Sequence, residues 1–228
     1  MTSTVQDPGL PPLAVPHLPV LVKPLLRGVS HQVAFFVALV AGGLLVWAHR
    51  SGPAWRALAV FAVCQAALFG ISAAYHRPTW SPVARARMRR LDHVGIYLQI
   101  AGSYTPVCVL GMGGEAGDRL LAWVWAGAGL GIVKTLFWVH APKPISAGLY
   151  VLLGWAVMSE WSAITAALGS LGTALMLIGG ALYTVGALIY ALKRPNPWPR
   201  TFGYHEIFHL LVVAAAMCHF EMVRRVAG

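Results

Sequence analysis

A short run near the C-terminus, His205-Glu206-Ile207-Phe208-His209, carries two histidines at the spacing of a metal-binding helix. Residues four positions apart lie on one face of an α-helix, about 6 Å apart along its axis. Two imidazoles placed in this way can bind one Zn²⁺ ion at about 2.0–2.1 Å. The run also has the HExxH pattern of metalloproteases, in which the glutamate is a general base. The spacing predicts a zinc site and leaves the reaction open.

Three other polar residues can complete this site. His76 lies at the end of an apolar stretch, and Ser72 precedes it by one helical turn on the same face. Asp92 lies near the start of the next apolar stretch, where it can accept a proton from a water at the metal or orient that water. Three protein ligands with an open fourth position are typical of catalytic zinc. The predicted zinc ligands are therefore His76, His205 and His209. The predicted catalytic residues are Asp92 and Ser72.

The remaining histidines each stand alone at or near the end of an apolar stretch. Single histidines in such places are usually interfacial or hydrogen-bonded to neighbouring groups. We interpret six residues in this way: His17, His31, His49, His93, His140 and His219.

The composition is that of a membrane protein. The chain has 228 residues, of which 58% are hydrophobic and only 11% are charged, whereas soluble domains carry about 25% charged residues. A formal charge of +10 would suggest nucleic acid binding in a soluble protein. Here the basic residues lie mainly in short segments between apolar runs. We therefore expect membrane lipids as partners, with no nucleic acid. No protein partner or oligomeric state is indicated.

Seven apolar stretches are each long enough to cross a bilayer, which requires about 20 mostly apolar residues. The predicted fold class is therefore an all-α integral membrane protein, a seven-transmembrane-helix bundle over residues 23–228. Residues 1–22 are rich in proline and are predicted to be a flexible cytoplasmic arm. The predicted spans are approximately 31–49, 55–76, 91–112, 119–139, 145–165, 171–192 and 202–222.

The distribution of lysine and arginine predicts the orientation of these spans. If the N-terminus is cytoplasmic, eleven of these residues lie in cytoplasmic segments and five lie outside, with Lys134 left out because it falls within a span. Basic residues are enriched on the cytoplasmic side of membrane proteins. We therefore predict that the N-terminus is inside and the C-terminus is outside. In this orientation the predicted zinc site lies at the cytoplasmic face.

Four motifs, in their order and spacing over about residues 23–225, resemble the haemolysin III group of the progestin and adipoQ receptor superfamily. The adiponectin receptors are distant relatives of this group. A further stretch, residues 75–82, is especially similar to the bacterial branch. The four motifs are Ser72-Ala-Ala-Tyr-His76, Leu91-Asp92-His93-Val94-Gly95-Ile96, Gly102-Ser103-Tyr104-Thr105-Pro106 and the run from His205 to His209.

This resemblance implies seven helices in the bacterial inner (plasma) membrane, with zinc held by the three predicted histidines. It also implies that Ser72 and Asp92 hold the water at the metal. Members similar to the adiponectin receptors are linked to ceramide hydrolysis, which implies a zinc-dependent hydrolase of a lipid amide or ester. The receptor branch has Gln where this chain has Glu206, a difference that favours Asp92 as the base.

Three other functions compete with hydrolysis. The first is a non-enzymatic, zinc-stabilised membrane protein that senses or regulates lipid state, and it would use the same ligands. The second is a cytolytic protein, although nothing in the chain resembles a secreted pore-former. The third is a HExxH intramembrane protease. Such proteases use a further acidic ligand downstream, and the only acid after His209 is Glu221, near the far side of the membrane.

Overall fold

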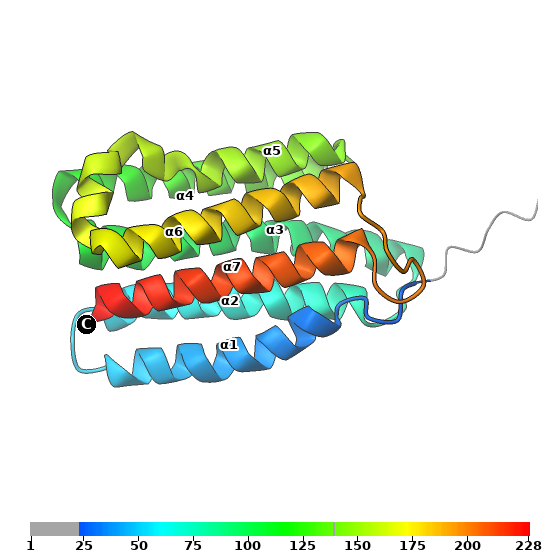
Figure 1. Cartoon of the computed structure of the whole chain (residues 1–228), viewed down its shortest axis with the longest axis horizontal. Coiled ribbons are helices and arrows are strands. Elements are labelled where there is room, and N and C mark those ends of the chain that lie inside the picture. The colour runs from blue at the N-terminus through cyan, green and yellow to red at the C-terminus, as the bar shows by residue number, and fades with distance from the viewer. Residues whose placement is uncertain (1–22, 139) are drawn as a thin grey trace, which may run out of the picture.

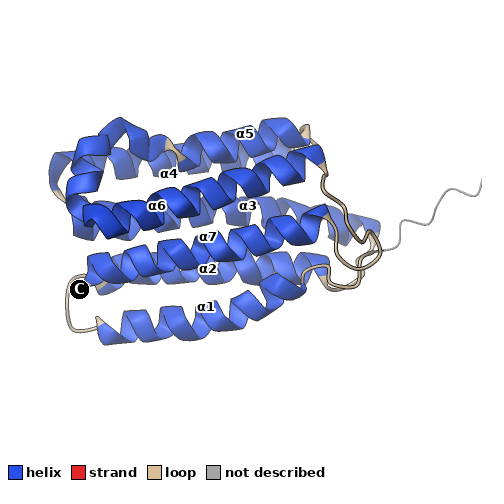
Figure 2. Ribbon diagram, viewed as in Figure 1, coloured by secondary structure: helices blue, strands red, loops and turns tan. Residues whose placement is uncertain are grey.

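The computed structural model describes residues 23–138 and 140–228 as a bundle of helices (Figure 1). The predicted N-terminal arm, residues 1–22, lies outside the described residues. Within those residues the chain forms helices and connecting loops without a β-strand (Figure 2). The elements are α1 (Val29–Ala48), α2 (Trp55–His76), α3 (Pro82–Pro106), the π-helical turn η1 (Val107–Met112), α4 (Gly114–Phe137), α5 (Lys143–Gly154), the 3₁₀ turn η2 (Ala156–Glu160), α6 (Trp161–Leu192) and α7 (Tyr204–Ala227).

Large apolar side chains cover much of the outside of this bundle. Apolar outer side chains are expected where lipid takes the place of water. Helices suit this environment because they satisfy their own backbone hydrogen bonds. The prediction of an all-α, multi-pass membrane protein is therefore confirmed. Examples of these exposed side chains are Phe36, Val40, Trp123, Leu130 and Leu152.

Six helical segments in the described part of the chain are long and apolar enough to cross a membrane. Four of them agree with predicted spans within about five residues at their ends, and a fifth, Pro82–Met112, begins before the predicted span of 91–112. The remaining segment, Pro144–Leu192, contains α5, η2 and α6 in 49 residues. The chain turns back within it, so that α5 and α6 lie side by side (Figure 1). Seven spans and their orientation stay predictions.

The third helix begins earlier than we predicted. We expected the arginines of residues 85–90 to lie in a loop before a span that starts at residue 91. The structure instead begins α3 at Pro82, where the Ser81 side chain accepts a hydrogen bond from the backbone N–H of Ala84 at 3.4 Å. Serine before a helix and proline in its first turn are both favoured starts. The arginines of residues 85–90 interrupt the apolar pattern, so the pattern does not mark this start.

Two glycines let neighbouring segments pack closely together. Gly102 in α3 packs against Cys64 in α2, where an added Cβ would lie 2.6 Å from the Cys64 Cβ. Small residues allow such close helix contacts in membranes. Gly28, just before α1, has a φ of 80°, and an added Cβ there would lie 2.8 Å from the Cβ of His76. The Gly28 contact brings the start of α1 against the end of α2 at one end of the bundle, while the Gly102 contact packs α3 against the middle of α2.

The segments before α1 and α7 are joined at that same end. The backbone N–H groups of Leu25 and Leu26 donate to the carbonyls of Arg200 and Thr201 at 3.1 and 3.2 Å. The Lys23 ammonium donates to the carbonyls of residues 77 and 78, at the end of α2. Desolvation, followed by the charges of nearby arginines, lowers the pKa of Lys23. The starts of α1 and α7 are thus fixed against the end of α2.

Candidate metal centre

Three imidazoles converge where α2 ends and α7 begins. His76 is the last residue of α2, and His205 and His209 lie in the first two turns of α7. All three are buried, and their candidate ligand nitrogens lie within 4.8 Å of one another. The Nε2 atoms of His76 and His205 are 3.2 Å apart. Two nitrogens bound to one tetrahedral zinc at its usual bond length would be about 3.3 Å apart.

The arrangement of these nitrogens fits a bound cation. A hydrogen bond between His76 and His205 requires one of the two facing nitrogens to carry a proton. His209 brings a third ring into the same space, and its Nδ1 is buried without a hydrogen-bond partner in the described part of the chain. A metal ion would accept the lone pairs that converge here. The three histidines can therefore hold a metal ion.

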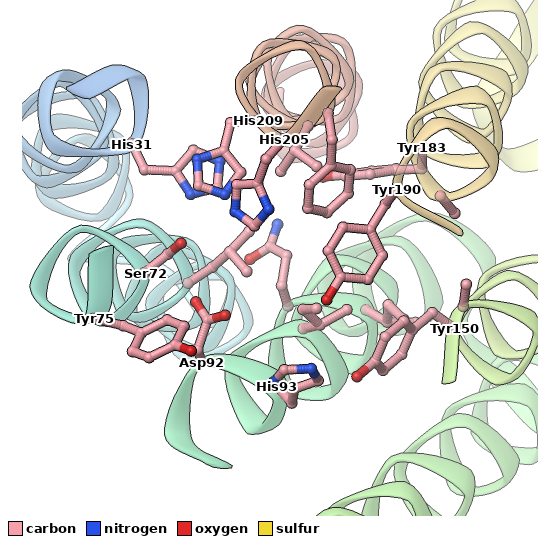
Figure 3. A pocket seen from close by; sticks show the side chains of 18 of the residues that line it. His31, Ser72, Tyr75, Asp92, His93, Tyr150, Tyr183, Tyr190, His205 and His209 are labelled. Carbon is pink, nitrogen blue, oxygen red and sulfur yellow. The ribbon is translucent and has the colours of Figure 1, made fainter. Parts of the chain in front are cut away.

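Asp92 and Ser72 reach the same space from α3 and α2 (Figure 3). Asp92 Oδ2 lies 3.9 Å from His76 Nε2. Ser72 is buried, and its hydroxyl is within hydrogen-bonding reach of the Asp92 carboxyl group. The structure thus brings together all five residues that the sequence singled out. The roles of Asp92 and Ser72 stay predictions.

Glu206 lies beside two of these histidines in sequence but is engaged elsewhere. Its Oε1 accepts a hydrogen bond from Arg27 Nε at 2.5 Å, and its Oε2 accepts one from the backbone N–H of Gly203 at 2.8 Å. The second contact caps the start of α7, where a carboxylate is favoured. Only 3% of the side chain is exposed. The glutamate of the HExxH run therefore joins the start of α7 to the segment before α1.

His31 belongs to the site, and of the two alternatives in our interpretation, interfacial or hydrogen-bonded, the interfacial one is wrong for this residue. Its side chain is 2% exposed, and its ring stacks on that of His209 with centroids 3.8 Å apart and planes 5° apart. The spacing of small and apolar residues in α1 contained the signal. His31 begins the inward-facing stripe of that helix, which continues through Ala34, Ala38, Gly42 and Leu45. A polar residue on such a stripe should be treated as buried.

These residues line one end of a cavity of about 520 Å³, a volume typical of small-ligand sites. Arg85, Arg89 and His140 line it near the histidines, while His219 lines its deep end. The walls combine apolar side chains such as Leu68 with several tyrosines (Figure 3). The tyrosines are Tyr75, Tyr104, Tyr150, Tyr183, Tyr190 and Tyr204. A long, mainly apolar molecule can therefore lie with one end at the histidines.

Comparison with known proteins identifies the relatives of this chain. Residues 20–220 match the family described as haemolysin-III related. The chain is 28% identical over 200 residues to the hemolysin-3 homolog of Bacillus subtilis (strain 168), a match that covers 86% of this chain and 91% of that protein. It is 29% identical over 200 residues to hemolysin-3 of Bacillus cereus, covering 86% and 88% of the two chains. It is also 31% identical over 179 residues to the adiponectin receptor protein of Drosophila melanogaster, covering 69% of this chain and 39% of that protein.

Proposed function

We propose a function for this chain, which belongs to the haemolysin-III-related family: it is a zinc-dependent membrane hydrolase that cleaves an amide or ester bond of a lipid. One observation carries the proposal. Three buried imidazoles from α2 and α7 converge beside Asp92, in the wall of a cavity that can hold an acyl chain. Three nitrogen ligands with one open position are the arrangement of a catalytic zinc site.

The residues divide the work between binding and proton transfer. His76, His205 and His209 would hold Zn²⁺, which when bound polarises a carbonyl oxygen and makes water a better nucleophile. Asp92 accepts the proton, because it is the only carboxylate among the described residues that line the cavity. Ser72 holds the Asp92 carboxyl group in place. The apolar walls hold the acyl chain so that its carbonyl lies at the histidines.

The position of Glu206 favours this mechanism over proteolysis. In a HExxH protease the glutamate acts as the base, which requires a carboxylate that is free to accept a proton. Here both oxygens of Glu206 already accept hydrogen bonds, one from Arg27 and one from Gly203. We therefore assign Glu206 a structural role.

We also propose seven spans, with the N-terminus and the metal centre at the cytoplasmic face of the inner membrane. A continuous helix of 49 residues would be about 70 Å long, more than twice the thickness of the hydrocarbon core. Gly169 has a φ of 62° within α6, and we assign it as the boundary between the fifth and sixth spans. The eleven-to-five distribution of basic residues supports the orientation. Reporter fusions at Gly228 and at Arg77 should report opposite sides of the membrane.

Comparison of wild type with His76→Ala tests the hydrolase. Lipids extracted from cells that produce each protein would be compared by mass spectrometry, and fatty acid release from purified protein would be measured on amide-linked and ester-linked lipids. We expect release by wild type, loss in His76→Ala, and full release by His49→Ala. His49 is a matched control because it bonds to the Leu45 carbonyl, at the opposite end of α1 from His31. A protein that binds zinc but changes no lipid would instead support a non-enzymatic metal clamp between α2 and α7.

A further inference from the structure

The cavity continues past the histidines to a second group of polar side chains. Gln99, Ser103, Tyr183 and His219 line it from α3, α6 and α7, and we call them the distal polar cluster. Gln99 follows Asp92 by seven residues, about 10 Å along α3. His219 follows His209 by ten residues, about 15 Å along α7. The cluster therefore lies well inside the bundle, away from the metal centre.

Several polar atoms of this cluster are buried without partners. Gln99 is 3% exposed, and its Nε2 donates to Ser103 Oγ at 3.1 Å, while its Oε1 has no hydrogen-bond partner among residues 23–138 and 140–228. His219 approaches the Met176 carbonyl through Nε2 at 3.3 Å, but its Nδ1 has no partner in the same residues. The Tyr183 hydroxyl lies within reach of the Gln99 side chain, and no other partner for it is present among the described residues.

Unsatisfied polar groups are costly inside a membrane protein, where lipid offers no replacement for water. In a native protein such groups require an explanation, usually a bound water or ligand. Here the residues that carry these atoms line a cavity. This location indicates that a bound molecule brings a hydrogen-bonding group to them.

The cluster is uncharged, and this limits the chemistry of its ligand. It consists of an amide, two hydroxyl groups and an imidazole. The charged residues that line the cavity, Arg27, Arg85, Arg89 and Asp92, belong instead to the segments around the metal centre. A phosphate or an ammonium group would have no counter-charge at the distal polar cluster. A hydroxyl group, which both donates and accepts, fits the free carbonyl oxygen of Gln99 and the other unpaired atoms.

We propose that the distal polar cluster binds a hydroxyl group on the acyl chain of the lipid, while the carbonyl of that chain lies at the metal centre. The proposal rests on the proposed function for the identity of the ligand, and it adds a preference for hydroxylated chains. A separation of 10–15 Å corresponds to roughly eight to twelve bonds of an extended chain. The preferred hydroxyl group is therefore near the middle of a long acyl chain.

Binding of three fatty acids of equal length to the purified full-length protein tests this preference. One acid is unsubstituted, one carries a hydroxyl group about ten carbons from the carboxyl group, and one carries it beside the carboxyl group. Affinities would be measured by competition against a fluorescent fatty acid. We expect the mid-chain hydroxyl to strengthen binding by roughly tenfold. The isomer with the hydroxyl group beside the carboxyl group should gain nothing at this cluster.

Substitutions then locate the effect. Gln99→Met and Tyr183→Phe keep the shape of each side chain and remove its polar atoms, so each should reduce the preference without weakening binding of the unsubstituted acid. Thr135→Val is the matched control. Thr135 is buried and its hydroxyl group also has no partner among the described residues, but it does not line the cavity. Its variant should keep the full preference.

Three results would overturn the proposal. The first is equal affinity of the wild-type protein for the three acids, as expected if water fills the cluster. The second is a hydroxyl preference that survives both cavity substitutions. The third is no binding of any of the acids. The proposed hydrolysis is tested separately, because these binding measurements need no turnover. A clear hydroxyl preference without hydrolysis would remove the reaction and keep the binding site. Hydrolysis without a hydroxyl preference would keep the reaction and remove the proposed binding site.

Discussion

Two carboxylates lie close to the histidines, in regions of very different character. Glu206, in the first turn of α7, is held by Arg27 and by the backbone of Gly203. Asp92, in α3, lines the cavity 3.9 Å from a nitrogen of His76. The glutamate has the better-known motif, and the aspartate has the better-placed carboxyl group. The hydrogen-bond partners of a carboxylate, more than the motif in which it lies, therefore decide whether it can accept a proton.

The largest expected effect concerns the metal on which the comparison depends. We expect wild-type protein to carry about one zinc ion per chain. His205→Ala/His209→Ala should carry none, because a single remaining histidine cannot hold the ion. Metal content after purification in detergent, measured by mass spectrometry, checks this. Unchanged zinc in the double variant would show that these histidines are not ligands, and the comparison of the two carboxylates would lose its basis.

The next effect separates the two carboxylates directly. Asp92→Asn keeps the shape of the side chain and removes the proton acceptor, so hydrolysis should fall by about 10²–10⁴ while zinc stays bound. Glu206→Gln should hydrolyse at nearly the wild-type rate, since its carboxylate does not line the cavity. Rates would be compared at equal zinc occupancy. An active Asp92→Asn beside an inactive Glu206→Gln would reverse our assignment and favour the protease hypothesis.

A smaller effect sharpens the structural role of Glu206. Glu206→Gln weakens a charge-assisted hydrogen bond with Arg27, and we expect the free energy of unfolding to fall by about 1–3 kcal/mol. Arg27→Gln should lower it by a similar amount. The double variant should lose less than the sum of the two, because both substitutions remove one interaction. Thermal unfolding in detergent measures all three variants. Fully additive losses would show that the pair does not act together.

The smallest expected effect concerns His31, which stacks on the proposed ligand His209. His31→Ala removes the stacked ring and should weaken zinc binding by about threefold to tenfold, the range expected for one aromatic contact. His31→Phe keeps a ring in this place and should retain most of the affinity. Competition with a zinc chelator measures both. Equal zinc loss in the two variants would mean that the nitrogens of His31 matter more than its ring.

Much of this site was readable from local spacing. The four-residue spacing of His205 and His209 predicts a shared helix face, and the order of the apolar stretches predicts His76 and Asp92 at a similar depth. In the structure Asp92 lies inside α3 rather than at its start. His31 was missed because it was judged alone, without the small residues that continue its face of α1. The distal polar cluster was missed for a related reason. Gln99, Tyr183 and His219 lie in three separate helices, and only tertiary packing shows that they face one cavity.

The helix boundaries also differ in how far the local sequence predicts them. The length and apolar character of α1, α2 and α4 come from residues within each helix, so the prediction placed them well. The start of α3 depends on Ser81 and Pro82, and the arginines that follow them do not belong to an apolar stretch. The turn at Gly169 depends on a positive φ, which an isolated glycine in an apolar run does not reveal.

The three histidines of the candidate metal centre also impose an order of events on biosynthesis. His76 and His205 are 129 residues apart in the chain, although their imidazoles touch in the folded protein. A ribosome that adds about 5–20 residues per second releases the second ligand many seconds after the first. The last helix made is thus the one that completes the centre. Binding of the proposed metal ion must therefore follow synthesis of α7, because a chain truncated before Tyr204 has only one of the three histidines.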